Sequence, residues 1–92
     1  MRALVVIDML KDFIYEDGAL PTGKEVLKIT SFIAQKTIKY RKDGYPIIYV
    51  CDRHKKDDKE FDMFPPHCVA GTAGGEIITE LDVRPEDKII YK

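Results

Sequence analysis

Three short apolar runs, separated by polar segments, dominate the hydrophobic pattern of the chain. Residues 3–7 (Ala-Leu-Val-Val-Ile) and 46–51 (Pro-Ile-Ile-Tyr-Val-Cys) are continuous and rich in β-branched side chains, and residues 88–92 (Lys-Ile-Ile-Tyr-Lys) form a third run. A continuous run, in contrast to an alternating one, is typical of a parallel strand covered on both faces. The pattern therefore predicts three strands of a parallel sheet, with residues 3–7 as a central strand.

The segment between the first two runs has the periodicity of an amphipathic helix. Thr22 followed by Glu25 forms a capping-box pattern, and Gly44 supplies a C-terminal stop. We therefore predict a helix over residues 23–43, which makes the first two strands part of a βαβ unit. The apolar positions that recur at helical spacing are Val26, Ile29, Ile33 and Tyr40.

The second half of the chain begins with a long polar segment. Residues 52–71 are charge-rich and broken by Pro65-Pro66, which predicts an irregular loop of the kind that carries functional sites. Residues 73–81 predict a second helix, weakened by Gly74 and Gly75, and residues 85–87 predict a turn. Three strands with two helices cannot cover both faces of a sheet, so we expect a further segment or a second subunit to complete the cover.

Composition and charge narrow the class of protein. The chain has 92 residues, 45% apolar and 34% charged, as expected for one soluble globular domain or part of one. Fifteen basic and sixteen acidic residues leave a net charge of −1, which excludes a global basic field for nucleic acid or anionic membranes. The apolar run at residues 3–7 is shorter than a signal peptide requires, and no segment approaches the ~20 apolar residues of a membrane span.

Candidate chemistry gathers where the strands end. Each predicted strand is followed or closed by an ionisable residue: Asp8, Asp52 and Lys92. Ligands of open parallel sheets bind beyond the carboxyl ends of the strands, so we expect these three side chains to share a cleft. The alternative is that each charge is merely solvated where its strand meets water.

Asp52, His54 and His67 form a candidate metal site. Asp52 and His54 are two residues apart in an extended segment, so their side chains project to the same face. One carboxylate and two imidazoles that leave coordination positions open are the ligands of many catalytic zinc and iron sites. The alternatives are a surface histidine at His54 and a packing role for His67.

The two cysteines have spacing that fits neither a disulfide framework nor a close metal pair. We expect free thiols in a reducing compartment, and therefore a cytoplasmic protein. Cys51 ends an apolar strand and reads as a small buried side chain. Cys68 is adjacent to His67, but neighbours in an extended chain point to opposite sides, which argues against mutual activation. The glycine-rich residues 71–75 lack a phosphate-loop pattern and favour a tight turn.

The motifs together resemble the first half of the isochorismatase-like cysteine hydrolases, which include nicotinamidases. The similarity rests on the order and spacing of five segments that span the whole chain. These are Val5–Met9 with Asp12-Phe13, Gly18–Pro21, Asp52–His54, Pro65–Val69 with Gly71-Thr72 and Gly75-Glu76, and Ile89–Lys92. The resemblance implies a three-layer α/β/α parallel-sheet fold, with residues 1–92 as the N-terminal portion of a single domain.

The resemblance also implies roles. Asp8 would be the general base toward a cysteine thiol, Lys92 would stabilise the thiolate and developing charge, and Phe13 would contact substrate. Asp52, His54 and His67 would bind a divalent metal, zinc first and iron or manganese as alternatives, with no organic cofactor. In the family the nucleophilic cysteine lies well downstream of the lysine, so we expect these 92 residues to be inactive alone.

The implied reaction is hydrolysis of a small amide through a thioester. Leu10 and Lys55-Lys56 depart from the usual family residues and leave the substrate open, with nicotinamide as a hypothesis. We expect a homo-oligomer or completion by the C-terminal half.

One rival is a non-catalytic half-domain that binds a metal or a partner. Another is a flavodoxin-like signalling domain, which requires paired acids after the first strand.

Overall fold

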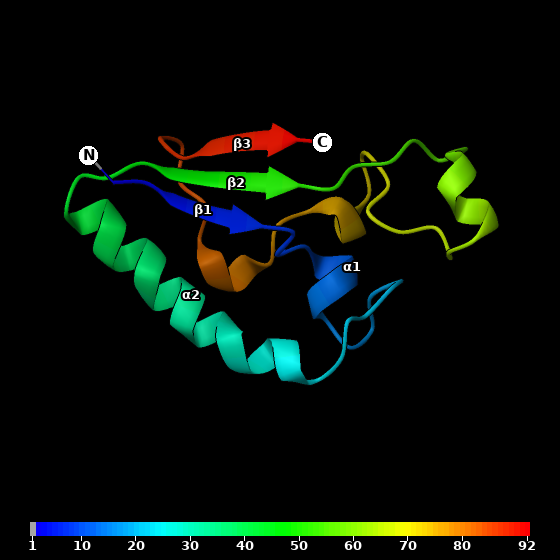
Figure 1. The fold of residues 1–92 in the computed structure, drawn as a ribbon, viewed down its shortest axis with the longest axis horizontal. Coiled ribbons are helices and arrows are strands. Elements are labelled where there is room, and N and C mark those ends of the chain that lie inside the picture. Colours follow the sequence, from blue (N-terminus) through cyan, green and yellow to red (C-terminus); the bar gives the residue numbers. More distant parts are fainter. Residues whose placement is uncertain (1) are drawn as a thin grey trace.

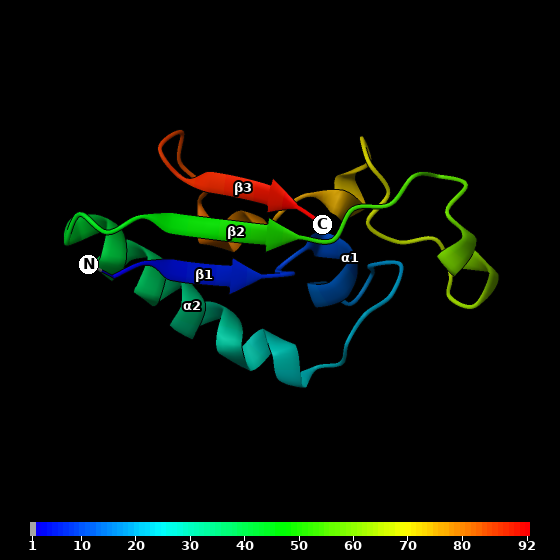
Figure 2. The same ribbon diagram turned by 45° about the horizontal axis from the view of Figure 1, so that its top comes forward.

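The computed structural model describes residues 2–92 as a parallel sheet with one long helix on one face (Figures 1 and 2). Strands β1 (Leu4–Ile7), β2 (Ile47–Cys51) and β3 (Lys88–Tyr91) lie in the order β1-β2-β3. Both pairs are parallel, which confirms the three predicted strands. Within the described residues β1 pairs only with β2, so the prediction that residues 3–7 form the central strand is wrong here, and β2 occupies that place.

Helix α2 (Glu25–Lys42) confirms the predicted helix over residues 23–43. The predicted capping box is wrong, because the Thr22 hydroxyl donates to the Phe13 carbonyl at 2.8 Å and the N-cap is Lys24. The hydroxyl thus ties the loop back to the preceding helical turn and does not close the helix. At the other end Gly44 has a φ of +80°, the left-handed conformation expected of a C-terminal stop.

The helix predicted over residues 73–81 does not form. In its place are two 3₁₀ turns, η2 (Ala73–Gly75) and η3 (Thr79–Leu81), joined by a segment in which Ile77 forms an antiparallel bridge with Leu10. That bridge requires extended backbone between the turns. A four-residue helix, α1 (Lys11–Ile14), and a 3₁₀ turn, η1 (Lys59–Asp62), complete the elements, and both are too short to leave a periodic pattern in the sequence.

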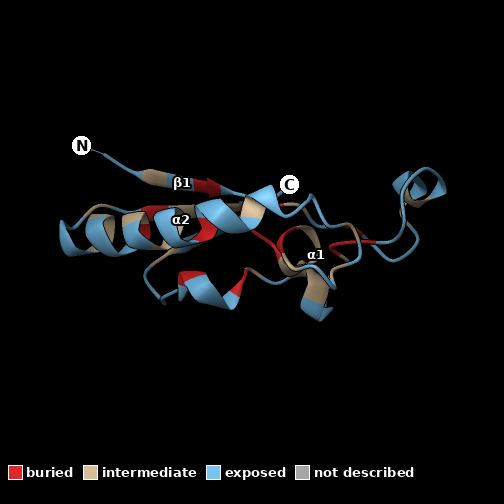
Figure 3. Ribbon diagram, turned by 90° about the horizontal axis from the view of Figure 1, so that it is seen from below, coloured by how far each residue is buried: buried red, intermediate tan, exposed pale blue. Residues whose placement is uncertain are grey.

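The hydrophobic core lies on one face of the sheet, where buried residues of β1 and β2 meet those of α1 and η3, and partly buried residues of α2 pack against them (Figure 3). On β1 the side chains alternate: Val6 is 5% exposed, whereas Val5 and Ile7 are 51% and 60% exposed. Ile7 lies in one row with Val50 and Ile90 across the sheet, and Ile90 is 51% exposed. The prediction that these elements leave one apolar sheet face uncovered is confirmed. No helix within residues 2–92 has both the length and the apolar composition of a membrane span.

Candidate metal and acid–base site

Asp8, Asp52 and Lys92 meet beyond the carboxyl ends of the three strands, as predicted. Lys92 Nζ lies 2.9 Å from Asp8 Oδ2, and the Asp52 N–H donates to Asp8 Oδ1 at 2.9 Å. Asp8 has a φ of 57° and its own N–H donates to the Val50 carbonyl, so its side chain turns across the strand ends. The ion pair with Asp8 raises the pKa of Lys92. One carboxylate thus joins the ends of all three strands.

A second pairing brings the two histidines together. His54 and Val69 form a parallel bridge, in which the His54 N–H donates to the Cys68 carbonyl and the Ala70 N–H donates to the His54 carbonyl. This places the rings of His54 and His67 with centroids 4.8 Å apart in an edge arrangement. Their side chains are only 8% and 3% exposed. The loop over residues 52–71, which extends beyond the sheet in Figures 1 and 2, is therefore pinned at its base.

The hydrogen bonds of the histidines aim both Nε2 atoms at Asp52. His67 Nδ1 lies 2.7 Å from the Pro65 carbonyl, an acceptor only, so Nδ1 carries the proton and Nε2 presents a lone pair. Both ring nitrogens of His54 face carboxylates, with Nδ1 3.0 Å from Asp58 Oδ2, so a proton on Nδ1 leaves Nε2 free to bind a metal ion. Asp52 Oδ2 is 2.9 Å from His54 Nε2 and 3.8 Å from His67 Nε2. The three ligand atoms lie within 4.8 Å of one another.

Two further carboxylates surround this cluster and were not predicted from the sequence. Glu60 Oε2 is 3.4 Å from His54 Nε2, and Asp58 orients His54 from the other side. Burial lowers the pKa of His54, but hydrogen bonds to Asp58 and Asp52 outweigh it and raise the pKa overall. Lone pairs facing carboxylate oxygens need a cation between them, either a proton or a metal ion. The donor set therefore fits a divalent metal.

Phe13, the predicted substrate contact, lies on α1 with its ring centroid 5.5 Å from that of His67. A hollow of about 310 Å³ is lined by both Phe13 and Asp8. Leu10, one of the residues that leave the substrate open, is fully buried in the core. Phe13 and Asp8 are thus the site residues that face one common hollow.

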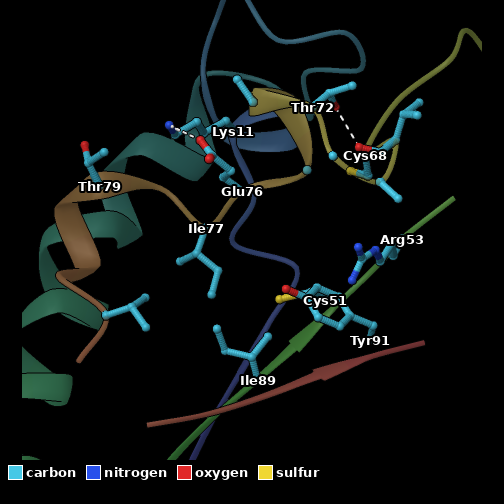
Figure 4. Close-up of a pocket in the computed structure, with 16 residues that line it drawn as sticks. Lys11, Cys51, Arg53, Cys68, Thr72, Glu76, Ile77, Thr79, Ile89 and Tyr91 are labelled. Atoms are coloured by element: carbon cyan, nitrogen blue, oxygen red, sulfur yellow. Dashed lines mark hydrogen bonds and ion pairs between the residues drawn. The ribbon is translucent and has the colours of Figure 1, made fainter. Parts of the chain in front are cut away.

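A separate cavity of about 590 Å³ lies elsewhere (Figure 4). Cys51, Ile89 and Tyr91 form its floor along the sheet, the Lys11–Glu76 ion pair lies opposite, and none of the five predicted catalytic and metal residues lines it. Both cysteines are free and buried. Burial, followed by nearby Asp52, raises the pKa of Cys68 to about 12, and burial also raises the pKa of Cys51. These thiols are poor nucleophiles.

Comparison with known proteins shows close structural relatives. The crystal structure of pyrazinamidase/nicotinamidase from Streptococcus mutans superposes with a TM-score of 0.89 at 31% identity, covering 100% of this chain and 56% of that one. Pyrazinamidase of Pyrococcus horikoshii in complex with zinc gives 0.87 at 32% identity, covering 98% and 50%. An Arabidopsis thaliana protein named "Probable inactive nicotinamidase" is 30% identical over 94 residues, covering 92% of this chain and 47% of that protein.

The chain spans about half the length of the curated relatives it matches, between 45% and 52% of each. The fold agrees with these relatives over 98% to 100% of the chain, and the flavodoxin-like alternative is set aside. Residues 2–92 match the isochorismatase domain along their whole length. The chain therefore belongs to the isochorismatase domain family.

Proposed function

We propose that the protein to which this chain belongs hydrolyses a small amide through a cysteine thiolate, and that residues 1–92 form the N-terminal portion of its single catalytic domain. One observation carries the proposal. The Asp8–Lys92 ion pair, at 2.9 Å, shares the Asp8 carboxylate with the backbone of Asp52, the residue on which both histidines converge. An acid–base pair and a metal-ligand set thus lie side by side.

In this proposal Asp8 takes the proton of the thiol, and Lys92 holds the thiolate and the charge that develops on the amide carbonyl. The thiolate attacks the carbonyl carbon, the C–N bond breaks with loss of ammonia or an amine, and water hydrolyses the thioester. Cys51 and Cys68 do not suit this step, because burial raises the pKa of both thiols. The nucleophile would come from a segment outside these 92 residues.

Asp52, His54 and His67 would hold the metal, with Glu60 as a fourth ligand on the same side of His54. Zinc is the first choice, and iron or manganese are the alternatives, because imidazole and carboxylate suit all three. A bound divalent ion would supply Lewis acidity and open positions that orient a lone pair of the substrate. Asp58 and the Pro65 carbonyl keep both imidazoles in the tautomer that binding needs. We propose no organic cofactor.

Nicotinamide is the first substrate to test. We expect the full-length polypeptide, supplied with zinc, to release ammonia from nicotinamide, and a chelator to abolish the release until zinc is restored. The assay is coupled ammonia detection over a panel that also contains pyrazinamide and aliphatic amides. Activity on another amide alone would keep the hydrolase and replace nicotinamide. An absence of ammonia from every amide, in zinc-loaded protein, would contradict the proposal.

A second candidate function is a non-catalytic module that keeps the metal or binds a partner. The similarity to a protein named as an inactive nicotinamidase favours it, as do the two buried thiols. This candidate requires zinc binding without hydrolysis in the same assay.

We also propose a cytoplasmic location, because both cysteines are free thiols. Assembly as a homo-oligomer, or with the remaining half of the domain, would cover the open sheet face.

Metal affinity is expected to fall on acidification. A histidine must be neutral to bind zinc, and the pKa of His54 is raised above 6.5 by Asp58 and Asp52 against the opposing effect of burial. Competition by protons therefore begins at a higher pH than for an ordinary histidine. Zinc dissociation constants across a pH series, measured against a chromophoric chelator, check this. Asp58→Asn should move the midpoint to lower pH, and an affinity independent of pH would contradict the expectation.

A further inference from the structure

Asp12 holds together three separate parts of the chain next to the metal-ligand set. Its Oδ2 accepts the Cys68 N–H at 2.8 Å and its Oδ1 accepts the Ala19 N–H at 2.9 Å. The Asp12 carbonyl also accepts the Leu20 N–H at 3.1 Å. With a main-chain donor on each carboxylate oxygen, Asp12 is already engaged and is not itself suited to bind metal or take a proton.

The backbone that Asp12 grips is in an unusual conformation. Cys68 has a φ of 49°, a left-handed conformation that a residue with a β-carbon rarely adopts. Pro65 and Pro66 stiffen the chain just before His67, so His67 lies between a rigid segment and a strained one. The hydrogen bond from the Cys68 N–H to Asp12 is a contact that holds the strained peptide in place.

Two glycines make room for Asp12, one beside its carboxylate and one beside its backbone. A β-carbon on Gly74 would overlap the Asp12 side chain, and one on Gly18 would collide with the Asp12 carbonyl group. The contact with Asp12 thus explains why the first residue of the glycine pair at residues 74–75, which weakened the prediction of a helix, has no side chain. The neighbouring Phe13 adds a side-chain contact, with its ring centroid 5.5 Å from that of His67.

We infer that Asp12 is a positioning residue that sets the place of the metal ligand His67, with Gly74 shaped to admit it. The inference rests on the proposed metal-dependent function. Helix α1 then supports His67 twice, through the Asp12 carboxylate on the backbone and through Phe13 on the ring. Loss of the hydrogen bond from the Cys68 N–H to Asp12 frees the His67 segment from α1 and lowers metal affinity without removing a ligand.

The test is the zinc affinity of the full-length protein with Asp12→Asn. Asparagine keeps the shape but presents an amide N–H to one of two main-chain donors, so one hydrogen bond is lost. We expect the zinc dissociation constant to rise roughly 10- to 100-fold, the range for groups that support metal ligands. The visible absorption of the cobalt-substituted protein should also change, which a purely structural role would not produce. Asp17→Asn, which removes the same charge from an exposed position shortly after α1, is the control.

Circular dichroism of the metal-free variants establishes that they fold. Gly74→Ala keeps the carboxylate but displaces it, so it should weaken zinc binding in the same way and decides the question if Asp12→Asn does not fold. A folded Asp12→Asn protein with wild-type zinc affinity and an unchanged cobalt spectrum would overturn the inference alone. A wild-type protein that binds no divalent metal would overturn it together with the metal site of the proposed function.

Discussion

Replacing Asp8 with asparagine is expected to lower kcat/KM of the full-length protein by roughly 10² to 10⁴-fold, the contribution of a positioned general base. Asparagine cannot take the proton of a thiol. It can still accept the Asp52 N–H, now 2.9 Å from Asp8 Oδ1, and it tolerates the left-handed backbone that residue 8 adopts. The loss should therefore fall on catalysis and leave the fold intact.

Steady-state ammonia release over a pH series measures this effect. The Asp8→Asn protein should lose most of its activity at every pH of the series, because no other group at this position can take the proton of the thiol. Asp43→Asn, at an exposed position after α2, removes the same charge as a control. A variant that keeps wild-type kcat/KM would assign the base to another residue.

Replacing Arg41 with methionine is expected to lower the free energy of unfolding by about 3 kcal/mol, as for one partner of a buried ion pair. Arg41 Nη2 lies 2.7 Å from Asp87 Oδ2, and the Asp87 side chain is only 2% exposed. The pair joins the last turn of α2 to the turn before β3. Methionine keeps the apolar stem of Arg41 but leaves Asp87 with the Arg84 N–H as its remaining donor.

Urea denaturation of the wild-type and Arg41→Met proteins measures the difference in the free energy of unfolding. Lys28→Met breaks the exposed Glu25–Lys28 pair, whose side chains are 85% and 74% exposed, and should change stability by less than about 1 kcal/mol. The double variant Arg41→Met/Asp87→Asn should recover part of the loss, because no buried charge is left unpaired. Equal losses in Arg41→Met and Lys28→Met would contradict the buried-pair explanation.

The sheet and the long helix were predictable because their signals are local. A continuous β-branched run needs no knowledge of its neighbours, and the ends of parallel strands meet at one edge by geometry, which predicts that Asp8, Asp52 and Lys92 lie together. The edge position of β1 within the described residues was not predictable from its own residues. Val5 and Ile7 give the strand the composition of one covered on both faces. Nothing within the described residues covers the face on which both of these side chains lie.

The errors arise where tertiary contacts override local pattern. Residues 73–81 have an apolar helical face, but the contact of Gly74 with Asp12 and the Leu10–Ile77 bridge select turns and extended backbone. Asp58 and Glu60 were missed because their approach to His54 depends on the path of the loop. Two acidic residues shortly after a candidate ligand were the available signal, although a charge-rich loop carries many such residues.

The register of the sheet has a consequence for folding. Ile7 is aligned with Val50, and Cys51 with Tyr91. The charged residues that follow the strands, Asp8, Asp52 and Lys92, therefore lie together at one edge of the sheet. A slip of β2 by one residue would turn its side chains to the opposite faces and carry Asp52 away from both Asp8 and His67. A sheet misaligned in this way would not bring Asp52 to the two histidines, so the proposed metal site would not form. The proposed metal site therefore depends on the observed register, and metal binding would favour correctly aligned molecules over slipped ones.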